Sequence, residues 1–374
     1  MWSLGIDQHE RQITISLRNA IGDVLLARQV STQPEKIQAF FQQLTQDRLQ
    51  KGEEFVAILE VCGFNDWLIR MLQDYRCYKV ILIQPDERKK CKTDRRDAAA
   101  LSELLWVNRA RLLAGKPVRG VRQVDIASNT DQENRRLTTL RKEARQARTR
   151  VINKIKHIVR RHNVQWHLPT KTFPTQSAIA WLKALVLPMV DRLEMNYLLA
   201  DLEHLEQRYL DLEKVIAERC IASEDAMIVS SMPGVGNFTA TALACRVGRV
   251  ERFPRSHSLP NYWGLTPRCR DSGEKTQRLG SITKAGNSHV RRILVESAWH
   301  YRHPPRLYKS LRDRRAGQPA AVISVADRAA QRLYRKFQKF QARGKASTKA
   351  VVAVARELAG FVWAALYPMA IKSA

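Results

Sequence analysis

The sequence predicts an α/β domain at the N-terminus followed by a mainly helical remainder, and three observations support this. Strand and helix patterns alternate over the first 110 residues, two long amphipathic segments follow, and short helices with glycine-containing loops occupy the rest. At 374 residues the chain is too long for one ordinary core, because single domains usually contain about 100–200 residues. We therefore expect three parts, at residues 1–118, 119–224 and 225–374.

The N-terminal pattern predicts three strands and then alternating helices and strands. The expected strands are Trp2–Asp7, Gln12–Leu17, Asp23–Val30, Phe55–Glu60 and Lys79–Ile83. Helices are expected at Gln33–Leu49, at Asn65–Gln73 and from Asp94 onward, where apolar residues recur at helical spacing. This βββαβαβα order is that of a ribonuclease-H-like sheet, although a fold analogy by itself does not establish a function.

Two long helices of opposite charge are predicted in the middle of the chain. Residues 135–161 hold 11 Lys/Arg and one Glu, whereas residues 191–218 hold eight Asp/Glu and three Lys/Arg. Apolar residues follow three- and four-residue steps in the first segment, at Leu137, Leu140, Ala144, Ala147, Val151 and Ile158. They form a sustained heptad in the second, at Met195, Leu198, Leu202, Leu205, Tyr209, Leu212 and Ile216. The pattern favours a coiled coil, within one chain or across a dimer, and a solvated helical connector explains it equally well.

The net charge of +28 predicts a polyanionic partner. Residues 1–118 hold 18 Lys/Arg and 15 Asp/Glu, so +25 of this charge falls on residues 119–374. Nucleic acid is the first candidate. A membrane surface would attract the same charge, but no apolar run approaches the roughly 20 residues of a spanning helix, and no signal peptide is evident. We therefore expect a cytoplasmic protein. Its six cysteines form no C-x-x-C pair, which argues against a zinc ribbon or a disulfide framework.

Four acids are predicted to converge at one edge of the N-terminal sheet. Asp7 ends the first strand, Glu60 ends the fourth, and Asp94 and Asp97 open the helix after the fifth. Asp94 and Asp97 are three residues apart, so a helix presents both on one face. Such a cluster repels itself unless a hard divalent cation such as Mg²⁺ compensates it, and two such ions can clamp a phosphoryl transfer.

Each acid taken singly also has a plain structural explanation. Asp94 could cap its helix, Glu60 could be a surface acid, and Asp97 could pair with neighbouring arginines. The conjunction of all four at ligand positions of this fold is what favours metal binding. His9 follows Asp7 by two residues and is expected to be incidental or an outer-shell group.

The C-terminal part contains two segments that suit a phosphate backbone. Pro233-Gly-Val-Gly236 resembles the turn of a helix-hairpin-helix module, in which Gly234 and Gly236 let bare amides face a phosphate; a plain glycine turn is the alternative. A basic, hydroxyl-rich loop follows before a helix at Val290–Ala298. Its expected phosphate-positioning charges are Arg268, Arg270, Lys275, Arg278, Lys284, Arg291 and Arg292.

A hydroxyl in this loop could attack a phosphodiester if neighbouring charges and a metal offset its high pKa. The residue types alone do not rank Ser272, Ser281 and Thr283, and all three could simply hydrogen-bond phosphates. Beyond Trp299, a basic tail with helices at Val322–Phe340 and Thr348–Tyr367 is expected to cap the C-terminal part.

The motifs as a set resemble the Insertion Sequence 110 family of transposases. They lie between residue 4 and about residue 300, in the family's order and spacing: Gly5-Ile-Asp7, Glu60, Lys92-Thr-Asp-Arg-Arg-Asp-Ala98, Pro233-Gly-Val-Gly236, Arg252-Phe-Pro254, Gly264-Leu-Thr-Pro267, Ser272-Gly273 and Ile282-Thr-Lys-Ala-Gly-Asn287. The long basic tail beyond Trp299 is a departure from the family pattern, and we expect it to be a structural or nucleic-acid-binding extension.

The resemblance implies an N-terminal RuvC-like domain with a D-E-D-D metal site, a coiled coil, and a C-terminal transposase domain with a catalytic serine. The metal and catalytic acids are then Asp7, Glu60, Asp94 and Asp97, with Mg²⁺ as the cofactor. The serine maps to Ser272, with Ser281 as second choice. The resemblance also implies a homo-oligomer, a dimer or a tetramer, in which one subunit's serine completes another's metal site. The implied partners are DNA and a noncoding bridge RNA that guides the reaction.

The implied reaction is DNA strand exchange through a covalent phosphoserine. Two rival functions use the same residues differently. A RuvC-like nuclease or resolvase would use the acids to activate water, and a non-catalytic nucleic-acid-binding protein would leave them inert.

Overall fold

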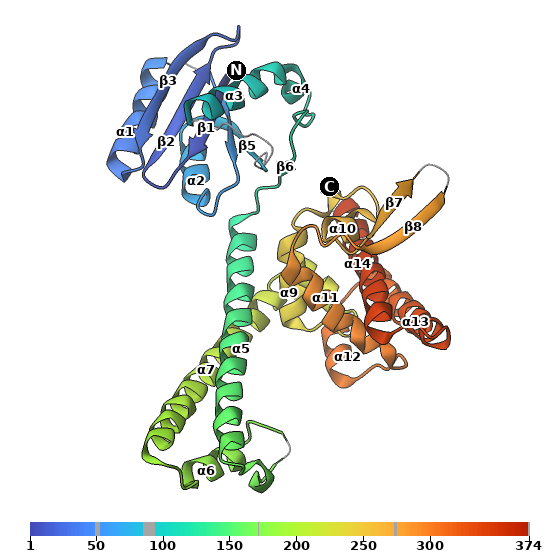
Figure 1. The fold of residues 1–374 in the computed structure, drawn as a ribbon. Coiled ribbons are helices and arrows are strands. Elements are labelled where there is room, and N and C mark those ends of the chain that lie inside the picture. Colours follow the sequence, from blue (N-terminus) through green and yellow to red (C-terminus); the bar gives the residue numbers. More distant parts are fainter. Residues whose placement is uncertain (49–52, 85–93, 171, 273–274, 373–374) are drawn as a thin grey trace. The chain divides into compact units, whose positions relative to one another are not determined.

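The computed structural model describes residues 1–48, 53–84, 94–170, 172–272 and 275–372 (Figure 1). The chain divides into two compact units, Met1–Ile126 and Ala127–Ala374. The first is a mixed α/β unit and the second is mainly helical, as the sequence predicts. The finer division into three domains at residues 118 and 224 remains a prediction.

A six-stranded mixed sheet forms the centre of the first unit. The strands are β1 (Trp2–Gln8), β2 (Gln12–Arg18), β3 (Val24–Ser31), β4 (Phe55–Glu60), β5 (Cys77–Ile83) and β6 (Gln123–Val124), in the order β3-β2-β1-β4-β5-β6. The first three strands are antiparallel to one another, while β4 runs parallel to both β1 and β5. The predicted strands are confirmed, and the two-residue β6 is an addition at the edge, antiparallel to β5.

Helices cover both faces of this sheet. On one face lie α1 (Pro34–Gln43), continued by a π-helical turn over Leu44–Arg48, and α2 (Asp66–Asp74). On the other lie α3 (Asp94–Val107) and α4 (Arg109–Leu113). The central strand β4 is buried on both sides, because Phe55 and Leu59 join one core while Val56 and Ile58 join the other. This burial explains why β4 is an unbroken apolar run.

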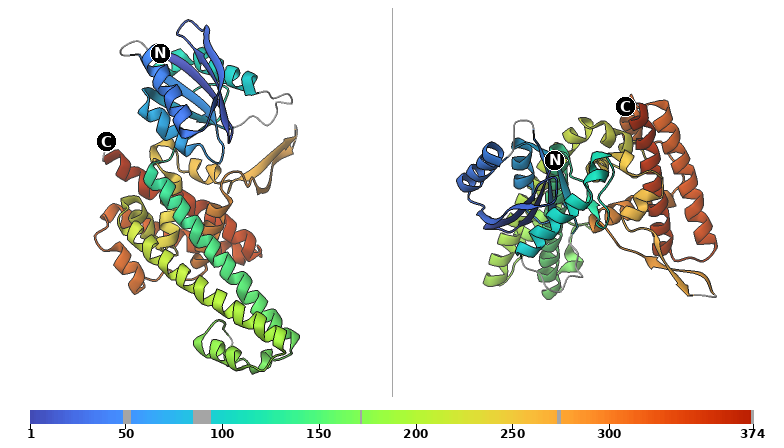
Figure 2. Two further views of the ribbon diagram at one scale, coloured as in Figure 1. Left: turned by 90° about the vertical axis from the view of Figure 1, so that its left-hand side faces the viewer. Right: turned by 90° about the horizontal axis from the view of Figure 1, so that it is seen from above.

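The second unit begins with an antiparallel helical hairpin. Its arms are α5 (Asn129–Arg161) and α7 (Met189–Ile221), and the connection contains a 3-10 turn (Gln165–His167) and α6 (Gln176–Ala184) (Figure 2). The predicted charge pairing occurs within one chain, because Arg148 Nε lies 2.6 Å from Glu206 Oε1 and Arg161 pairs with Asp191. Both arms also pack against α9 of the following core.

The predicted apolar seam of α5 is wrong at Leu140, which is 45% exposed. The buried face of this half of α5 carries Asn134, Thr138 and Arg141 instead. Thr138 and Arg141 are tolerated there because they have partners: Arg246 Nη1 donates to Thr138 Oγ1 at 3.0 Å, and Arg141 Nε donates to Glu213 Oε1 at 2.6 Å. Spacing alone therefore selected a wrong position at Leu140, whereas Ala144 of the same predicted stripe is buried.

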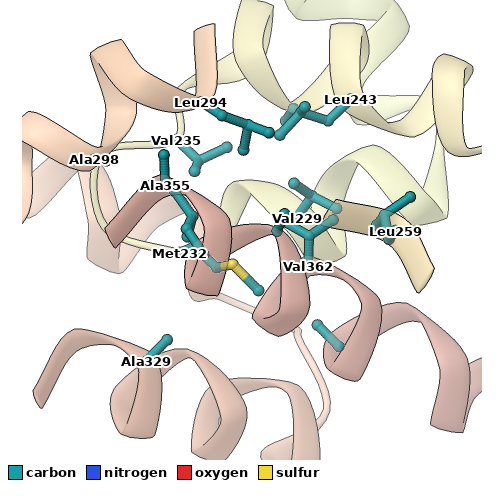
Figure 3. Packing of buried hydrophobic residues seen from close by; sticks show 14 of the residues in the cluster. Val229, Met232, Val235, Leu243, Leu259, Leu294, Ala298, Ala329, Ala355 and Val362 are labelled. Carbon is teal, nitrogen blue, oxygen red and sulfur yellow. The ribbon is translucent and has the colours of Figure 1, made fainter. Parts of the chain in front are cut away.

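The C-terminal core is built from short helices and two long ones. The helices are α8 (Glu224–Ser230), α9 (Asn237–Val247), α10 (Ser258–Tyr262), α11 (Ser288–Ala298), α12 (Lys309–Arg315), α13 (Ala320–Ala342) and α14 (Ser347–Lys372), with 3-10 turns at Val250–Arg252 and Trp299–Arg302. Figure 3 shows how Val229, Met232 and Leu243 meet Ala355 and Val362 of α14. The basic tail is thus part of this core, and α13 and α14 pack against each other.

Among the described residues, one helix is long and apolar enough to span a membrane by length and composition alone. It is α14, over Ser347–Tyr367, and half of that stretch is buried inside the protein. The expectation that no segment reaches spanning length is therefore wrong for this helix. Its apolar residues, among them Val354, Leu358 and Val362, lie in the C-terminal core.

Candidate metal centre and serine hairpin

The carboxyl ends of β1 and β4 place two of the predicted acids on adjacent strands. Ile6 pairs with Leu59 in the parallel register of these strands, so Asp7 and Glu60 each follow one residue later at the same edge. The edge is fixed by Asn65, whose side-chain amide donates to the Glu60 carbonyl at 3.1 Å and to Gln8 Oε1 at 2.8 Å. Two acids are thereby anchored on the rigid part of the sheet.

The predicted acids Asp94 and Asp97 come from the helix that packs across β1. They lie in the first turn of α3, which presses against β1 at Gly5. A Cβ atom on Gly5 would lie 2.2 Å from the Ala98 carbonyl oxygen and 2.5 Å from the Ser102 amide nitrogen. Glycine is therefore required for this close approach, which carries the first turn of α3 towards Asp7.

The structure brings together Asp7, His9 and Asp94. Their potential ligand atoms all lie within 4.8 Å of one another. His9 Nε2 lies 3.2 Å from Asp7 Oδ2 and 3.5 Å from Asp94 Oδ1. Glu60 and Asp97 lie outside this group, although the charge of Asp97 acts on Asp7. The sequence pattern undervalues His9, and its position two residues after a strand-end acid was the available signal.

Burial raises the pKa of the Asp7 carboxyl above its ordinary value, and the charges of Asp94 and Asp97 add to this while His9 opposes it. Burial is thus the main reason why the ionised form of Asp7 is disfavoured, and the neighbouring acids contribute less. Carboxylate oxygens suit hard divalent cations, and an imidazole at the same place extends the choice to softer divalent ions. The donor set therefore fits a divalent metal.

The predicted basic loop forms a β-hairpin rather than an irregular loop. Its strands are β7 (Pro267–Ser272) and β8 (Lys275–Ile282), with Arg270 opposite Arg278 and Ser272 opposite Lys275. The side chains of these four residues lie outside the described part of the structure, and so does all of Gly273. The backbone register places Ser272 where the hairpin turns, and the second-choice Ser281 near the other end of β8.

The base of the hairpin is held by a tight backbone crossing. Gly264 has a φ of +67°, and a Cβ there would lie 2.1 Å from the Ala285 carbonyl oxygen. Arg291 donates to the carbonyls of Trp263, Ala285 and Gly286 at 2.9–3.2 Å. This predicted phosphate-binding arginine thus joins the two loops that flank the hairpin.

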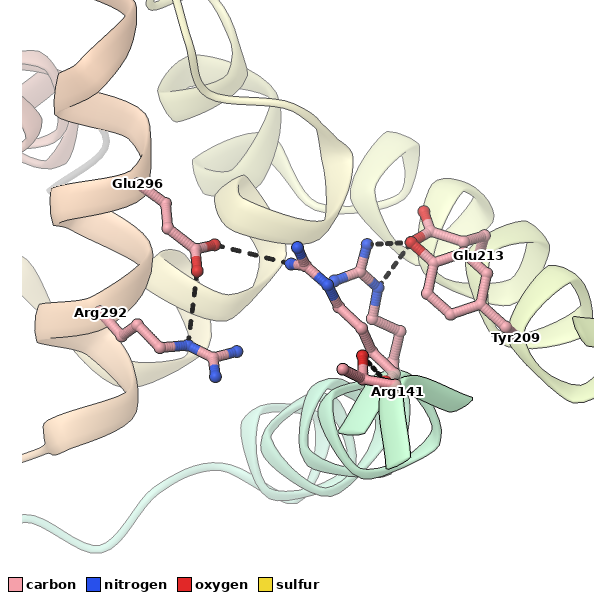
Figure 4. A network of polar contacts seen from close by, with 7 residues as sticks. Arg141, Tyr209, Glu213, Arg292 and Glu296 are labelled. Carbon is pink, nitrogen blue, oxygen red and sulfur yellow. Dashed lines mark hydrogen bonds and ion pairs between the residues drawn. The ribbon is translucent and has the colours of Figure 1, made fainter. Parts of the chain in front are cut away.

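The other predicted phosphate contacts are dispersed around this base. Arg268 Nη2 donates to the Thr283 carbonyl at 3.3 Å, and the Lys284 amide donates to the Gly264 carbonyl at 3.1 Å. Arg292 lies 3.6 Å from Glu296, which also meets Arg145 of α5 (Figure 4). The same figure shows Arg141, whose Nε lies 2.6 Å from Glu213 Oε1. Arg268 and Arg292 therefore already have partners within the protein.

The glycine turn between α8 and α9 has one packed and one open glycine. Gly234 has a φ of +78°, and a Cβ there would meet the Ser297 carbonyl and the His300 side chain at 2.8 Å. Gly236 precedes the first turn of α9, and a Cβ there would meet nothing within 4 Å. The open glycine is the one whose surroundings leave room for a ligand.

A buried histidine stands at the start of α11, directly after these loops. His289 is 8% exposed, and neither of its ring nitrogens has a hydrogen-bond partner in the described structure. Burial lowers the pKa of His289 to about 4, and four neighbouring cations add to the effect: Arg246, Lys142, Arg292 and Arg141. The ring is therefore neutral at physiological pH.

Comparison with known proteins finds transposase matches in both units. A family model for the DEDD transposase of IS110 elements matches residues 4–164, and a model described as the transposase IS116/IS110/IS902 family matches residues 226–310. The transposase for insertion sequence element IS1533 of Leptospira borgpetersenii is 27% identical over 91% of this chain and 97% of its own length.

Two further relatives match over shorter stretches. The putative transposase y4qE of Sinorhizobium fredii is 44% identical over 41% of this chain, and the transposase for insertion sequence element IS1111A of Coxiella burnetii is 29% identical over 64%. The matched stretches span 40% and 64% of these two relatives.

Proposed function

We propose that this chain is an insertion-sequence transposase of the IS110 type, like the proteins that it matches in both units, and that it recombines DNA through a divalent metal site and a serine nucleophile. The observation that carries this proposal is the group of Asp7, His9 and Asp94, with Glu60 in register on the adjacent strand. The group lies in the segment matched by the DEDD family model. Its acids are the ones that the sequence singles out.

We propose Mg²⁺ as the metal, held by Asp7, Glu60, Asp94 and Asp97. The bound metal would supply charge stabilisation at the phosphate under attack. His9 is proposed as a positioning residue, because its Nε2 reaches both Asp7 and Asp94 and so holds the strand-end acid against the helix acid.

The proposed nucleophile is the Ser272 hydroxyl, with Ser281 as the second choice. The hydroxyl gives up its proton as its oxygen forms a bond to the phosphorus of a DNA phosphodiester. The bond from phosphorus to one strand oxygen breaks, and that oxygen takes up a proton and leaves as a hydroxyl, so that no net proton is consumed. The resulting phosphoserine keeps the energy of the phosphodiester bond, so the strand can be rejoined to a new partner without ATP. The hairpin position of Ser272, opposite Lys275, suits a residue that must reach a substrate.

Two partners besides DNA belong to the proposal. A noncoding bridge RNA would guide the choice of DNA, and the +25 charge of residues 119–374 is large enough to hold two polyanions. A homo-oligomer, dimer or tetramer, would let one subunit's serine meet another's metal site. The proposed contacts to the nucleic-acid backbone are Gly236 in the turn before α9, and Arg268 and Lys284 at the base of the hairpin.

The experiment that tests the chemistry looks for a covalent protein–DNA species. Purified protein is incubated with Mg²⁺, labelled element-end DNA and its candidate flanking noncoding RNA, and the products are separated under denaturing conditions. Wild-type protein should give a labelled protein band. Ser272→Ala should lose that band, whereas Ser281→Ala should keep it.

The controls separate this proposal from a nuclease. Asp7→Asn should lose both the adduct and any cleavage, because the same metal site serves each reaction. Cleavage that continues in Ser272→Ala without any adduct would show that water is the nucleophile, and the resolvase-type function would then replace ours. Loss of the band in Ser281→Ala alone would move the nucleophile to that residue.

A further inference from the structure

A cavity of about 530 Å³ that is open to the surface lies on the C-terminal core, next to the base of the serine hairpin. It is lined by residues of three helices and of the loop that leads into β7: Ser256, His257, Pro260, Thr266, Arg332, Lys336, Arg356, Glu357, Gly360, Phe361 and Ala364. Its size falls within the range of about 300–1,000 Å³ that is usual for small-ligand sites. Arg332, Lys336, Arg356 and Glu357 lie beyond residue 310, where the family match of this unit ends.

The charges of this cavity are not balanced. Three cations line it against one acid, and Glu357 is engaged by both Arg332 and Lys336. Arg356 lies beside Glu357 in the chain and is partly buried, yet it has no hydrogen bond or ion pair within the described structure. The Arg356 guanidinium therefore has all its donors unused within the described structure, and a planar guanidinium suits an anionic ligand such as phosphate.

A glycine of α14 lines this cavity. Gly360 lies in the middle of α14, where glycine is about 1 kcal/mol less favourable than alanine. Its backbone has no positive φ, and a Cβ there would meet only the Ser256 carbonyl, at an ordinary 3.7 Å. Neither backbone strain nor close packing requires glycine here. The absence of a side chain at Gly360 means that only backbone lines the cavity at this point, opposite the Ser256 carbonyl.

We propose that this cavity binds a single unpaired nucleotide of the DNA strand, with the phosphate on Arg356 and the base against Phe361. The lining supplies the two kinds of group that single-stranded nucleic acid uses, a cation for the backbone and a partly exposed aromatic side chain that also packs against the core. Ser256, His257 and Thr266 supply hydrogen-bonding groups for the sugar or the base edge. DNA is the source because Thr266 immediately precedes the strand that carries Ser272, so this inference rests on the proposed function.

The test measures equilibrium binding of the full-length protein to two labelled DNA probes. One is a blunt element-end duplex, and the other is the same duplex with an unpaired overhang of three nucleotides. Arg356→Gln should weaken binding of the overhang probe about tenfold, the usual effect of losing one charged hydrogen bond, and leave the blunt duplex within twofold. Gly360→Leu fills the cavity without changing any charge and should give the same selective loss.

The matched control is Lys349→Gln, an exposed cation on the same helix that does not line the cavity. It should bind both probes as wild type does, and helical circular dichroism with thermal melting shows whether each variant is folded. A 5-iodouracil in the overhang should cross-link to the peptide that contains Phe361.

Each other outcome overturns the inference in a recognisable way. Equal binding of the overhang probe by Arg356→Gln and Lys349→Gln would show that the cavity takes no nucleotide. A selective loss only when the overhang is RNA would assign it to RNA. These results leave the serine chemistry intact, whereas a wild-type protein that binds neither probe would remove the proposed function as well.

Discussion

Replacing Gly5 with alanine measures how closely α3 must lie on β1 for the metal centre to form. The new Cβ would lie 2.2 Å from the Ala98 carbonyl oxygen, and ordinary contact begins near 3.4 Å, so the backbones must separate by about 1.2 Å. Overpacking of this kind costs about 1–3 kcal/mol of stability. The separation moves Asp94 away from Asp7 and should weaken divalent metal binding about tenfold or more.

Titration calorimetry with Mn²⁺ and thermal melting are the two measurements, and Gly63→Ala is the matched control. Gly63 lies in the same unit, and a Cβ there would meet nothing within 4 Å. The control should bind Mn²⁺ and melt as wild type does. If Gly5→Ala is indistinguishable from Gly63→Ala in both measurements, the close approach does not position Asp94 and our account of the site is wrong.

Three further changes test other parts of the structure. Arg141→Met should lower the free energy of unfolding by about 2 kcal/mol, because Glu213 loses its guanidinium partner at 2.6 Å; an unchanged chemical denaturation curve would contradict this. Gly264→Ala places a Cβ 2.1 Å from the Ala285 carbonyl at a φ of +67°, so amide hydrogen exchange should speed up across residues 264–287. Because the pKa of His289 is lowered to about 4 in the folded protein, the unfolded chain binds more protons and stability should fall as pH drops from about 6.5 towards 4. His289→Phe should flatten that part of the stability profile.

The first unit was predictable from the sequence because its apolar patterns are regular and its acids fall where those patterns end. Alternating strands and helices fixed the element order, and the acids fall at strand ends, where a sheet topology can be used to place them. The neighbouring positions of Asp7 and Glu60 follow from the parallel β1–β4 register. The role of Gly5 was not predictable, since a close approach of two backbones leaves no mark in the sequence beyond the glycine itself.

Several features of the second unit could not be predicted from patterns in the sequence. Leu140 fits an apolar repeat but is exposed, because Thr138 and Arg141 find polar partners across the interface and occupy the buried stripe. The residues of β7 and β8 are charged, hydroxylated and interrupted by glycine, so they carry no alternating apolar signal. Their pairing is set by main-chain hydrogen bonds, and the sequence indicated only a loop. His9 was undervalued for a related reason, since a spacing does not show which way a side chain turns.

The charge segregation of α5 and α7 also has a consequence for how the chain folds. The ion pairs Arg161–Asp191, Arg148–Glu206 and Arg141–Glu213 join residues 30, 58 and 72 positions apart. Formation of the pair nearest the hairpin tip closes the shortest loop and carries most of the loss of chain entropy. Each later pair forms next to one that already exists, so it adds little to this entropic cost. We therefore expect the two helices to pair first at the hairpin tip and then progressively towards α9. The opposite charges of the two helices favour one register of pairing. During synthesis, α7 would capture the α5 of its own chain before a second copy arrives.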